Sequence, residues 1–381
     1  MSETKYFPTV EAIDKASQVL DEILEPTPFQ RNANLSDIYD AEVYLKREDL
    51  QMVRSYKIRG AYNKIRTIDP ELMKNGIVCA SAGNHAQGVA FSCSKLKIMG
   101  SIFMPVTTPR QKIEQVRMFG KEFIEIILTG DTFDAANSAA IEYAQDNNKT
   151  FIPPFDDPKV MEGQGTIGRE IFNQSKEPLD YIFVPIGGGG LASGLGAYIS
   201  RMSPSTKIIG VEPGGAPCMK AAIENGGPIK LEHIDKFVDG AAVQLAGTHT
   251  YEVCRQVLDD IVVVPEGAVC TTIIHMYNKS AIVVEPAGAL AVAALKFYKD
   301  KIKGKRVACV VSGSNNDITR MEEIREKSLL YEGLKHYFIV NFPQKSGAIL
   351  SFIRDVIGPT DDLVYIQYIR KTNKNFGPAL I

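Results

Sequence analysis

Short apolar runs alternate with amphipathic helical stretches along most of this chain. Several of the runs are apolar at nearly every position, as in "YIFVPI" (181–186) and "IVVVPE" (261–266). Strands of this kind are covered by helices on both faces, as in the parallel sheets of α/β proteins. The pattern therefore predicts an α/β fold with parallel sheets. The predicted strands are 42–46, 76–81, 98–105, 122–127, 181–186, 207–213, 261–266 and 307–313.

Helix start signals follow several of these strands. Asp131 opens "DTFDAANSAAIEYAQ", and Gly83 with Asn84 leads from a strand into "GNHAQGVAFSCSKL". In both segments, a residue suited to a turn or cap precedes a helical pattern, which favours a helix N-terminus there. In open α/β sheets, ligands bind in the crevice where strands end and helices begin. We expect the chemically active residues at these junctions.

Length and composition narrow the class of protein. A chain of 381 residues exceeds what one hydrophobic core usually holds, so two or three domains are expected. A formal net charge of -2 disfavours nucleic acid as a partner. The N-terminal residues do not resemble a secretory signal, and no apolar run has the length of a membrane span. We expect a soluble, cytoplasmic protein without membrane contact.

The six cysteines carry no metal-site or disulfide pattern. They are scattered without a CxxC pair, and several lie in apolar runs such as "GIVCAS" and "VACVVSG". Such cysteines are typical of buried thiols in a reducing compartment. We therefore expect no metal.

Lys57 stands where an extended pattern gives way to a helical one, in "MVRSYKIRGAYNKI" (52–65). A lysine amine is nucleophilic only when neutral, and burial beside apolar groups lowers its pKa toward that state. For a lone lysine, a surface position on the first turn of a helix is the commoner case. Two explanations, a surface residue and a nucleophile, stay open on this residue alone.

Four consecutive glycines, Gly187, Gly188, Gly189 and Gly190, separate an apolar strand from a helix that begins near Leu191. Such a loop can turn its backbone N–H groups inward, and the helix N-terminus adds its dipole, which favours a phosphate. The loop lacks the lysine and hydroxyl residue of a P-loop and the spacing of a dinucleotide fingerprint. A flexible turn is the alternative, but four glycines are costly in entropy.

Two further junctions offer polar side chains. Ser81, Asn84 and His85 lie at a strand-to-helix turn and suit a carboxylate or a phenolic oxygen. Ser312 ends the strand in "VACVVSGSNND" and can meet a ring nitrogen without protonating it. Together with Lys57 and the glycines, these residues supply an amine, a phosphate cradle, a carboxylate clamp and a ring-nitrogen partner. That set fits pyridoxal phosphate.

The sequence resembles the fold-type II pyridoxal-phosphate enzymes, which have the tryptophan synthase β-like fold, and within them the biosynthetic threonine dehydratases (threonine ammonia-lyases). The motifs that carry the resemblance are, in order, "SYKIRGA", "SAGNHAQG", "GGGGL", "EPAGA" and "SGSN". The resemblance implies that Lys57 holds the cofactor covalently and acts as catalytic base. It also implies that Tyr56 stacks near the ring and that Glu285 lies near the ring edge. Further implied cofactor contacts are Asn84 to the ring hydroxyl, Gly187, Gly188, Gly189, Gly190 and Leu191 to the phosphate, and Ser312 to the pyridine nitrogen.

For the substrate, the resemblance implies a carboxylate site made by Ser81, Asn84 and His85. The implied reaction is elimination of water from L-threonine, which yields 2-oxobutanoate and ammonia in isoleucine biosynthesis. Ala82 replaces the second serine that relatives use to racemise serine, which disfavours racemisation. Cys218 replaces the acidic residue of metal-binding relatives, so Glu212 is expected to be structural. A serine dehydratase, a β-replacement enzyme and an inactive amino-acid sensor stay open as alternatives.

The C-terminal part differs in pattern. Residues 334–358 and 363–371 predict a strand, a helix entered at Gly347 and a second strand, the start of a βαβ module that ends before its sheet closes. We expect a catalytic domain over 1–330, with a small subdomain at about 50–155, and a linker near 320–333 that is itself helical. The tail, 331–381, resembles part of an ACT-like α+β regulatory domain. This resemblance implies isoleucine as an allosteric ligand and a homo-oligomer, either a dimer or a tetramer.

Overall fold

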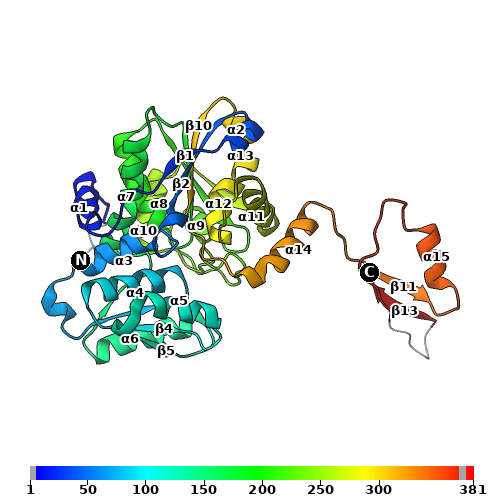
Figure 1. Ribbon diagram of the computed structural model, residues 1–381, viewed down its shortest axis with the longest axis horizontal. Coiled ribbons are helices and arrows are strands. Elements are labelled where there is room, and N and C mark those ends of the chain that lie inside the picture. The colour runs from blue at the N-terminus through cyan, green and yellow to red at the C-terminus, as the bar shows by residue number, and fades with distance from the viewer. Residues whose placement is uncertain (1–5, 369–374) are drawn as a thin grey trace. The chain divides into compact units, whose positions relative to one another are not determined.

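The computed structural model describes residues 6–368 and 375–381. The chain forms two compact units, residues 1–328 and residues 329–381. The first unit contains two sheets and the second contains one. Figure 1 shows the course of the chain through these elements.

The larger sheet of the first unit has six strands in the order β1-β2-β10-β7-β8-β9. Every neighbouring pair is parallel except β1 and β2, which are antiparallel. The strands are β1 (Phe29–Arg31), β2 (Glu42–Arg47), β7 (Tyr181–Pro185), β8 (Lys207–Pro213), β9 (Asp260–Val264) and β10 (Arg306–Val311).

The smaller sheet has four parallel strands in the order β5-β4-β3-β6. They are β3 (Ile77–Ala80), β4 (Gly100–Met104), β5 (Ile124–Leu128) and β6 (Thr150–Phe151). All eight strands predicted from apolar runs are confirmed, and so are the α/β class and the parallel sheets. The short strands β1 and β6 were not predicted.

Helices connect and cover these strands. Those of the first unit are α1 (Val10–Leu20), α2 (Ala33–Tyr39), α3 (Lys57–Arg66), α4 (Asn84–Leu96), α5 (Arg110–Gly120), α6 (Phe133–Asp146), α7 (Pro158–Gln174), α8 (Gly190–Met202), α9 (Cys218–Asn225), α10 (Thr248–Val257), α11 (Glu266–Ser280), α12 (Pro286–Ala293) and α13 (Leu295–Ile302). Helix α14 (Met321–Tyr331) spans the boundary between the units and confirms the predicted helical linker. Single 3₁₀ turns occur at η1 (Glu48–Leu50), η2 (Pro70–Met73), η3 (Lys121–Phe123) and η4 (Ile318–Arg320).

Both sheets are covered by helices on both faces, which explains the continuously apolar strands. In β3, Ile77 and Cys79 pack with α3 and α4, whereas Val78 and Ala80 pack with α6 on the opposite face. In the larger sheet, α7 and α8 share a core with β7 and β10. Helix α12 lies against β7 and β10 as well and is buried at every position, as its apolar sequence requires.

Two predicted helix starts shift by one residue. The cap of α6 is Thr132, whose hydroxyl accepts from Ala135 N at 3.2 Å, and not Asp131. Helix α4 is capped by the backbone at Gly83, so Asn84 is its first residue and its side chain makes no cap. The Asn84 amide is therefore available for other contacts.

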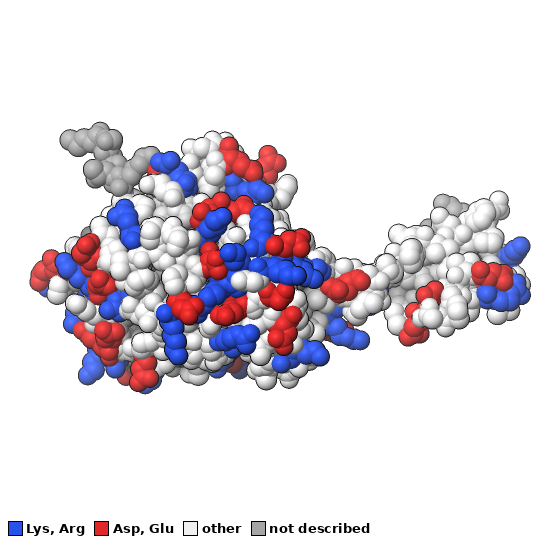
Figure 2. Space-filling view, turned by 90° about the horizontal axis from the view of Figure 1, so that it is seen from above, with Lys and Arg blue, Asp and Glu red and all other residues white. Residues whose placement is uncertain are grey.

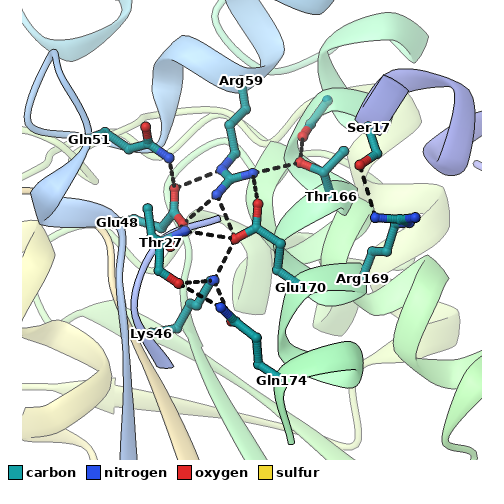
Figure 3. A network of polar contacts seen from close by, with 11 residues as sticks. Ser17, Thr27, Lys46, Glu48, Gln51, Arg59, Thr166, Arg169, Glu170 and Gln174 are labelled. Atoms are coloured by element: carbon teal, nitrogen blue, oxygen red, sulfur yellow. Dashed lines mark hydrogen bonds and ion pairs between the residues drawn. The ribbon is translucent and has the colours of Figure 1, made fainter. Parts of the chain in front are cut away.

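A buried ion network ties the start of α3 to its surroundings (Figure 3). The Arg59 guanidinium donates to Glu48 at 2.8 Å through both Nε and Nη2, and to Glu170 at 2.6 and 2.9 Å. Lys46 also pairs with Glu170, at 2.5 Å. Burial alone would raise the pKa of Glu48, but the charges of Arg59 and Lys46 outweigh it and hold that pKa below its usual value. Thr27, Thr166 and Gln174 complete the hydrogen bonds.

The second unit has a three-stranded antiparallel sheet with one helix. Its elements are β11 (Ile339–Pro343), α15 (Ala348–Asp355), β12 (Gln367–Tyr368) and β13 (Phe376–Leu380). The predicted order of strand, helix and strand is confirmed, with Gly347 at the helix entry at φ 85°. Positions 369–371 of the second predicted strand lie outside the described residues.

One expectation for this unit is wrong. The segment expected to end the chain before a sheet closes forms β13, which lies between β11 and β12 and pairs with both. Strands β11 and β12 therefore run in the same direction without touching, as a split βαβ unit. Phe342 forms the core and contacts the rings of Phe352 and Tyr368 edge-on at 5.2 and 5.8 Å.

Charged side chains of both signs are interspersed on the face shown in Figure 2. This distribution accords with the small formal net charge of -2. Within residues 6–368 and 375–381, none of the helices has both the length and the apolar character needed to span a membrane.

We expect Arg59→Met to lower the free energy of unfolding by about 3 to 5 kcal/mol, because it leaves the buried Glu48 and the partly buried Glu170 with one cation. The chain has no tryptophan, so unfolding in urea is best followed by far-ultraviolet circular dichroism. Arg110→Met removes an exposed pair with Glu114 and serves as control, with an expected change below about 1 kcal/mol. Equal midpoints for the two variants would contradict a supporting role of the network.

Candidate active site

Lys57 is the first residue of α3 and follows a short stretch that pairs with the end of β10. Tyr56 N donates to Ser312 O at 3.1 Å, and Ser314 N donates to Arg54 O at 2.9 Å. This pairing places Lys57 and Ser312 beside each other although 255 positions separate them (312 − 57). The helix start thus lies at the carboxyl end of a parallel strand, where α/β proteins bind ligands.

The amine of Lys57 is held in a low-polarity environment. Its Nζ donates to Pro154 O at 2.8 Å and lies 5.4 Å from the centre of the Tyr56 ring. Burial lowers the pKa of Lys57 to about 8, against the opposing charge of Glu285. A lysine of this pKa is neutral in a useful fraction near neutral pH, as a nucleophile or base must be. The partly buried side chain and its hydrogen bond to Pro154 O favour the nucleophile over a surface lysine.

The carbonyl groups of the first two glycines accept hydrogen bonds from the protein. Gly187 O accepts from Cys218 Sγ at 3.4 Å, and Gly188 O accepts from Thr250 Oγ1 at 2.6 Å. Gly189 has φ 95°, a conformation that favours glycine, and it precedes the first turn of α8. The N–H groups of that turn have no partner within the helix. The result is a nest of amides at a helix N-terminus, an arrangement that suits an anion.

One loop joins the amine to this nest. Pro154 accepts from Lys57, and the next residue, Phe155, packs on the glycines, so that a Cβ at Gly188 would lie 2.4 Å from its ring. Asp156 then accepts from the backbone of His249 and Thr250 at 2.9 and 3.1 Å, which orients the Thr250 hydroxyl. No local sequence signal pointed to this loop, because its role depends on contacts about 100 residues away.

The start of α4 brings Ser81 and Asn84 to the same region, whereas the His85 ring is engaged with the backbone. Gly83 N donates to Ser81 Oγ at 3.2 Å. Asn84 Nδ2 donates to Glu285 Oε1 at 2.6 Å, and Asn84 Oδ1 accepts from Asn315 Nδ2 at 2.7 Å. His85 is buried, with Nε2 3.0 Å from Ile152 O. Burial, and then the charge of Lys57, lower the pKa of His85 to about 3, so its ring is neutral.

Ser312 and Glu285 lie at the junction of β10 and α12. The Ser312 hydroxyl is buried and donates to Ala287 O at 3.2 Å. Glu285 is buried too, and burial followed by the charge of Asp239 raises its pKa to about 7. The sequence pattern did not reveal that Asn84 and Asn315 contact each other.

These residues fit pyridoxal phosphate. The nest suits a dianionic phosphate, the amine is poised to react with an aldehyde, and the Asn84 amide and Ser312 hydroxyl carry no charge. Among the described residues no three His, Cys, Asp or Glu side chains are grouped for a metal ion. Glu212 accepts from Met219 N and Lys220 N at 2.7 and 2.9 Å, and so caps α9.

Comparison with known families agrees with this chemistry. Residues 20–313 match the family model "Pyridoxal-phosphate dependent enzyme". Residues 326–381 match "C-terminal regulatory domain of Threonine dehydratase". The two matches cover the sheet-containing parts of the first and second units respectively.

Individual relatives are similar over nearly the whole chain. The L-threonine dehydratase biosynthetic IlvA of Halalkalibacterium halodurans is 58% identical over 98% of this chain and 90% of its own. Its counterpart in Bacillus subtilis is 56% identical over 98% of this chain and 88% of its own. A solved structure, the processed form of threonine deaminase isoform 2 from Solanum lycopersicum, is 36% identical with a TM-score of 0.79 and covers 86% of this chain and 96% of that one.

With these identities, the two parallel sheets and the amine beside a glycine nest, the chain belongs to the pyridoxal-phosphate dependent enzymes and, within them, to the biosynthetic L-threonine dehydratase family.

Proposed function

We propose that this protein eliminates water from L-threonine and releases 2-oxobutanoate and ammonia. The observation that carries the proposal is the Lys57 amine, with its pKa lowered to about 8, joined through Pro154 and Phe155 to a nest of glycine amides. The similarity to threonine dehydratases supplies the substrate.

The same residues would hold the cofactor. Lys57 would bind its aldehyde covalently, and the amides of Gly187, Gly188, Gly189, Gly190 and Leu191 would bind its phosphate. Asn84 would donate to the ring hydroxyl, Ser312 would face the pyridine nitrogen, and Tyr56 would lie beside the ring. When bound, pyridoxal phosphate supplies a conjugated system that stabilises negative charge at the substrate α-carbon.

The side chains divide the remaining work. Lys57, once its amine is free, accepts the α-proton, for which a pKa of about 8 suits neutral pH. The substrate carboxylate would be held by the Ser81 hydroxyl and by the backbone amides at the start of α4, those of Asn84 and His85. His85 would act through its backbone, because its ring is engaged with Ile152 O. The uncharged Ser312 hydroxyl adds no positive charge at the ring nitrogen.

The C-terminal unit is proposed to bind isoleucine and to regulate the enzyme. Its similarity to a threonine dehydratase regulatory domain supports this role. We assign the catalytic domain to 1–330, with its small subdomain at about 50–155, and the regulatory domain to 331–381. We also propose a homo-oligomer, dimer or tetramer, in the cytoplasm, and the six free buried thiols support a reducing compartment.

Purified protein with pyridoxal phosphate should convert threonine to 2-oxobutanoate, measured as the hydrazone of the oxo acid. Lys57→Ala should abolish both turnover and the yellow colour, because no amine remains to hold the cofactor. Serine and O-acetylserine, tested in parallel, would show a dehydratase or β-replacement enzyme if either exceeds threonine in kcat/KM. A wild-type protein that binds isoleucine but turns over none of these would instead be an amino-acid sensor.

The rate at which cofactor-free protein binds pyridoxal phosphate should depend on pH, because Lys57 reacts only when neutral and its pKa is about 8. The neutral fraction of Lys57 is about a tenth at pH 7 and about nine tenths at pH 9, so the rate should rise about tenfold and then level off. Stopped-flow absorbance at a series of pH values measures this rate. N-acetyl-lysine amide, with an ordinary pKa, is the control and should keep accelerating toward pH 10. A protein rate that parallels this control would contradict the lowered pKa.

Phe342→Ala should abolish inhibition by isoleucine and leave turnover without isoleucine unchanged. Phe342 is 3% exposed, and its truncation removes about 3 to 5 kcal/mol from the core of the second unit. Initial rates with and without isoleucine measure the effect. Leu334→Ala, at a side chain 74% exposed, is the control and should keep full inhibition. Retained inhibition in Phe342→Ala would place the isoleucine site elsewhere.

A further inference from the structure

A chain of four hydrogen-bonding groups crosses the active site at Asn84. Val53 O accepts from Asn315 Nδ2 at 2.9 Å, and the same Nδ2 donates to Asn84 Oδ1 at 2.7 Å. Asn84 Nδ2 then donates to Glu285 Oε1 at 2.6 Å. The participating side chains come from three separate segments, α4, the start of α12 and the loop after β10.

The Val53 end of this chain fixes the direction of the bonds in it. A backbone carbonyl at Val53 can only accept, so Asn315 must turn its nitrogen toward it. That nitrogen also faces Asn84, which must therefore present its oxygen there and its nitrogen to the Glu285 carboxyl group. Reversing the Asn84 amide would set its nitrogen against the Asn315 nitrogen, and its oxygen against the ionised form of the Glu285 carboxyl group. The orientation of Asn84 is thus determined by two neighbours and not by its own rotamer preference.

Backbone contacts hold Glu285 in its position. Its backbone N donates to Gly313 O at 3.2 Å, and it precedes the first residue of α12. A glutamate at a helix N-cap can bond to the helix backbone, but this one makes no cap and bonds to Asn84 instead. A Cβ at Gly313 would lie 2.4 Å from Glu285 Oε1, so the glycine leaves room for the carboxyl group.

We propose that Glu285 and Asn315 are positioning residues that lock the Asn84 amide so that an N–H, and not its oxygen, faces the cofactor. An amide nitrogen carries two hydrogens, of which Glu285 takes one, and the second is left for the phenolic oxygen of pyridoxal phosphate. This inference rests on the proposed role of Asn84 and adds the two residues that make it a donor. Without them the amide rotates, and half of its orientations present oxygen to an oxygen anion.

The test is a double-mutant cycle on cofactor binding, without substrate. Pyridoxal phosphate is titrated into cofactor-free protein, and its Kd and the visible circular dichroism per bound cofactor are measured. Glu285→Leu should weaken binding about tenfold and reduce the dichroism, because a hydrogen bond to a charged oxygen becomes poorly oriented. Glu285→Gln keeps an acceptor at the same place and should stay within about threefold of wild type.

The Asn84→Ala background decides whether the effect passes through Asn84. If it does, Asn84→Ala alone weakens binding, and adding Glu285→Leu changes the Kd by less than about twofold. An undiminished effect of Glu285→Leu in that background, or no effect of Asn84→Ala alone, would overturn the proposal. Asn315→Asp has nearly the same shape but sets an acceptor against Asn84 Oδ1. If Glu285→Leu does not fold, this variant replaces it, and the same changes in Kd are expected with and without Asn84→Ala.

Glu162→Leu is the matched control. Glu162 is as buried as Glu285, at 3% and 4% exposed, but its partners are Tyr6 and Lys159, away from this hydrogen-bond chain. It should lower the thermal midpoint without changing the Kd for pyridoxal phosphate. Because threonine takes no part in these titrations, a wild-type protein that binds the cofactor but leaves threonine intact would refute the proposed function and not the positioning role.

Discussion

The buried pairing of Arg59 with Glu48 and Glu170 is the constraint on which the rest of the active site depends. Arg59 lies two residues after Lys57 on α3, and its partners come from η1 and α7. Two cations and two carboxylates balance in the interior, so α3 cannot shift or rotate without leaving a charge unpaired, at a cost of several kcal/mol. The first turn of α3 is thereby held against the end of β10, and this fixes the position of the Lys57 amine.

Around this anchor the site is assembled from junctions that are far apart in the sequence. The carbonyl groups of the glycine nest accept from Thr250 and Cys218, and Pro154 O accepts a hydrogen bond from the amine. Each contact uses a backbone group on one side, which tolerates little displacement. The reactive amine and the anion site are in this sense one structure, joined by the loop at residues 154–156.

Most of the fold was predictable because covered parallel strands leave a distinct apolar signal. Strands β1 and β6 were missed since "FQR" and "TF" are too short to show a period. Lys57, Asn84, Ser312 and the glycines were found because each lies at a strand-to-helix junction with an unusual residue. The Arg59 network, Pro154 and the Asn315 contact gave no signal, since a buried charge or carbonyl acquires its meaning only from partners distant in sequence. For His85 the sequence motif predicted a role in binding the substrate, but the structure shows its ring bonded to Ile152 O.

Strand β13 has a consequence for how the chain matures. It is the middle strand of the second unit's sheet, yet it is the last of the three to be synthesised, and Leu380 pairs with Ile339. Among the described residues, β11 and β12 pair only with β13, so neither is paired until residues 376–380 leave the ribosome, whereas all strands of the first unit have by then emerged. The catalytic unit can therefore fold during translation, before the segment similar to a regulatory domain exists as a structure.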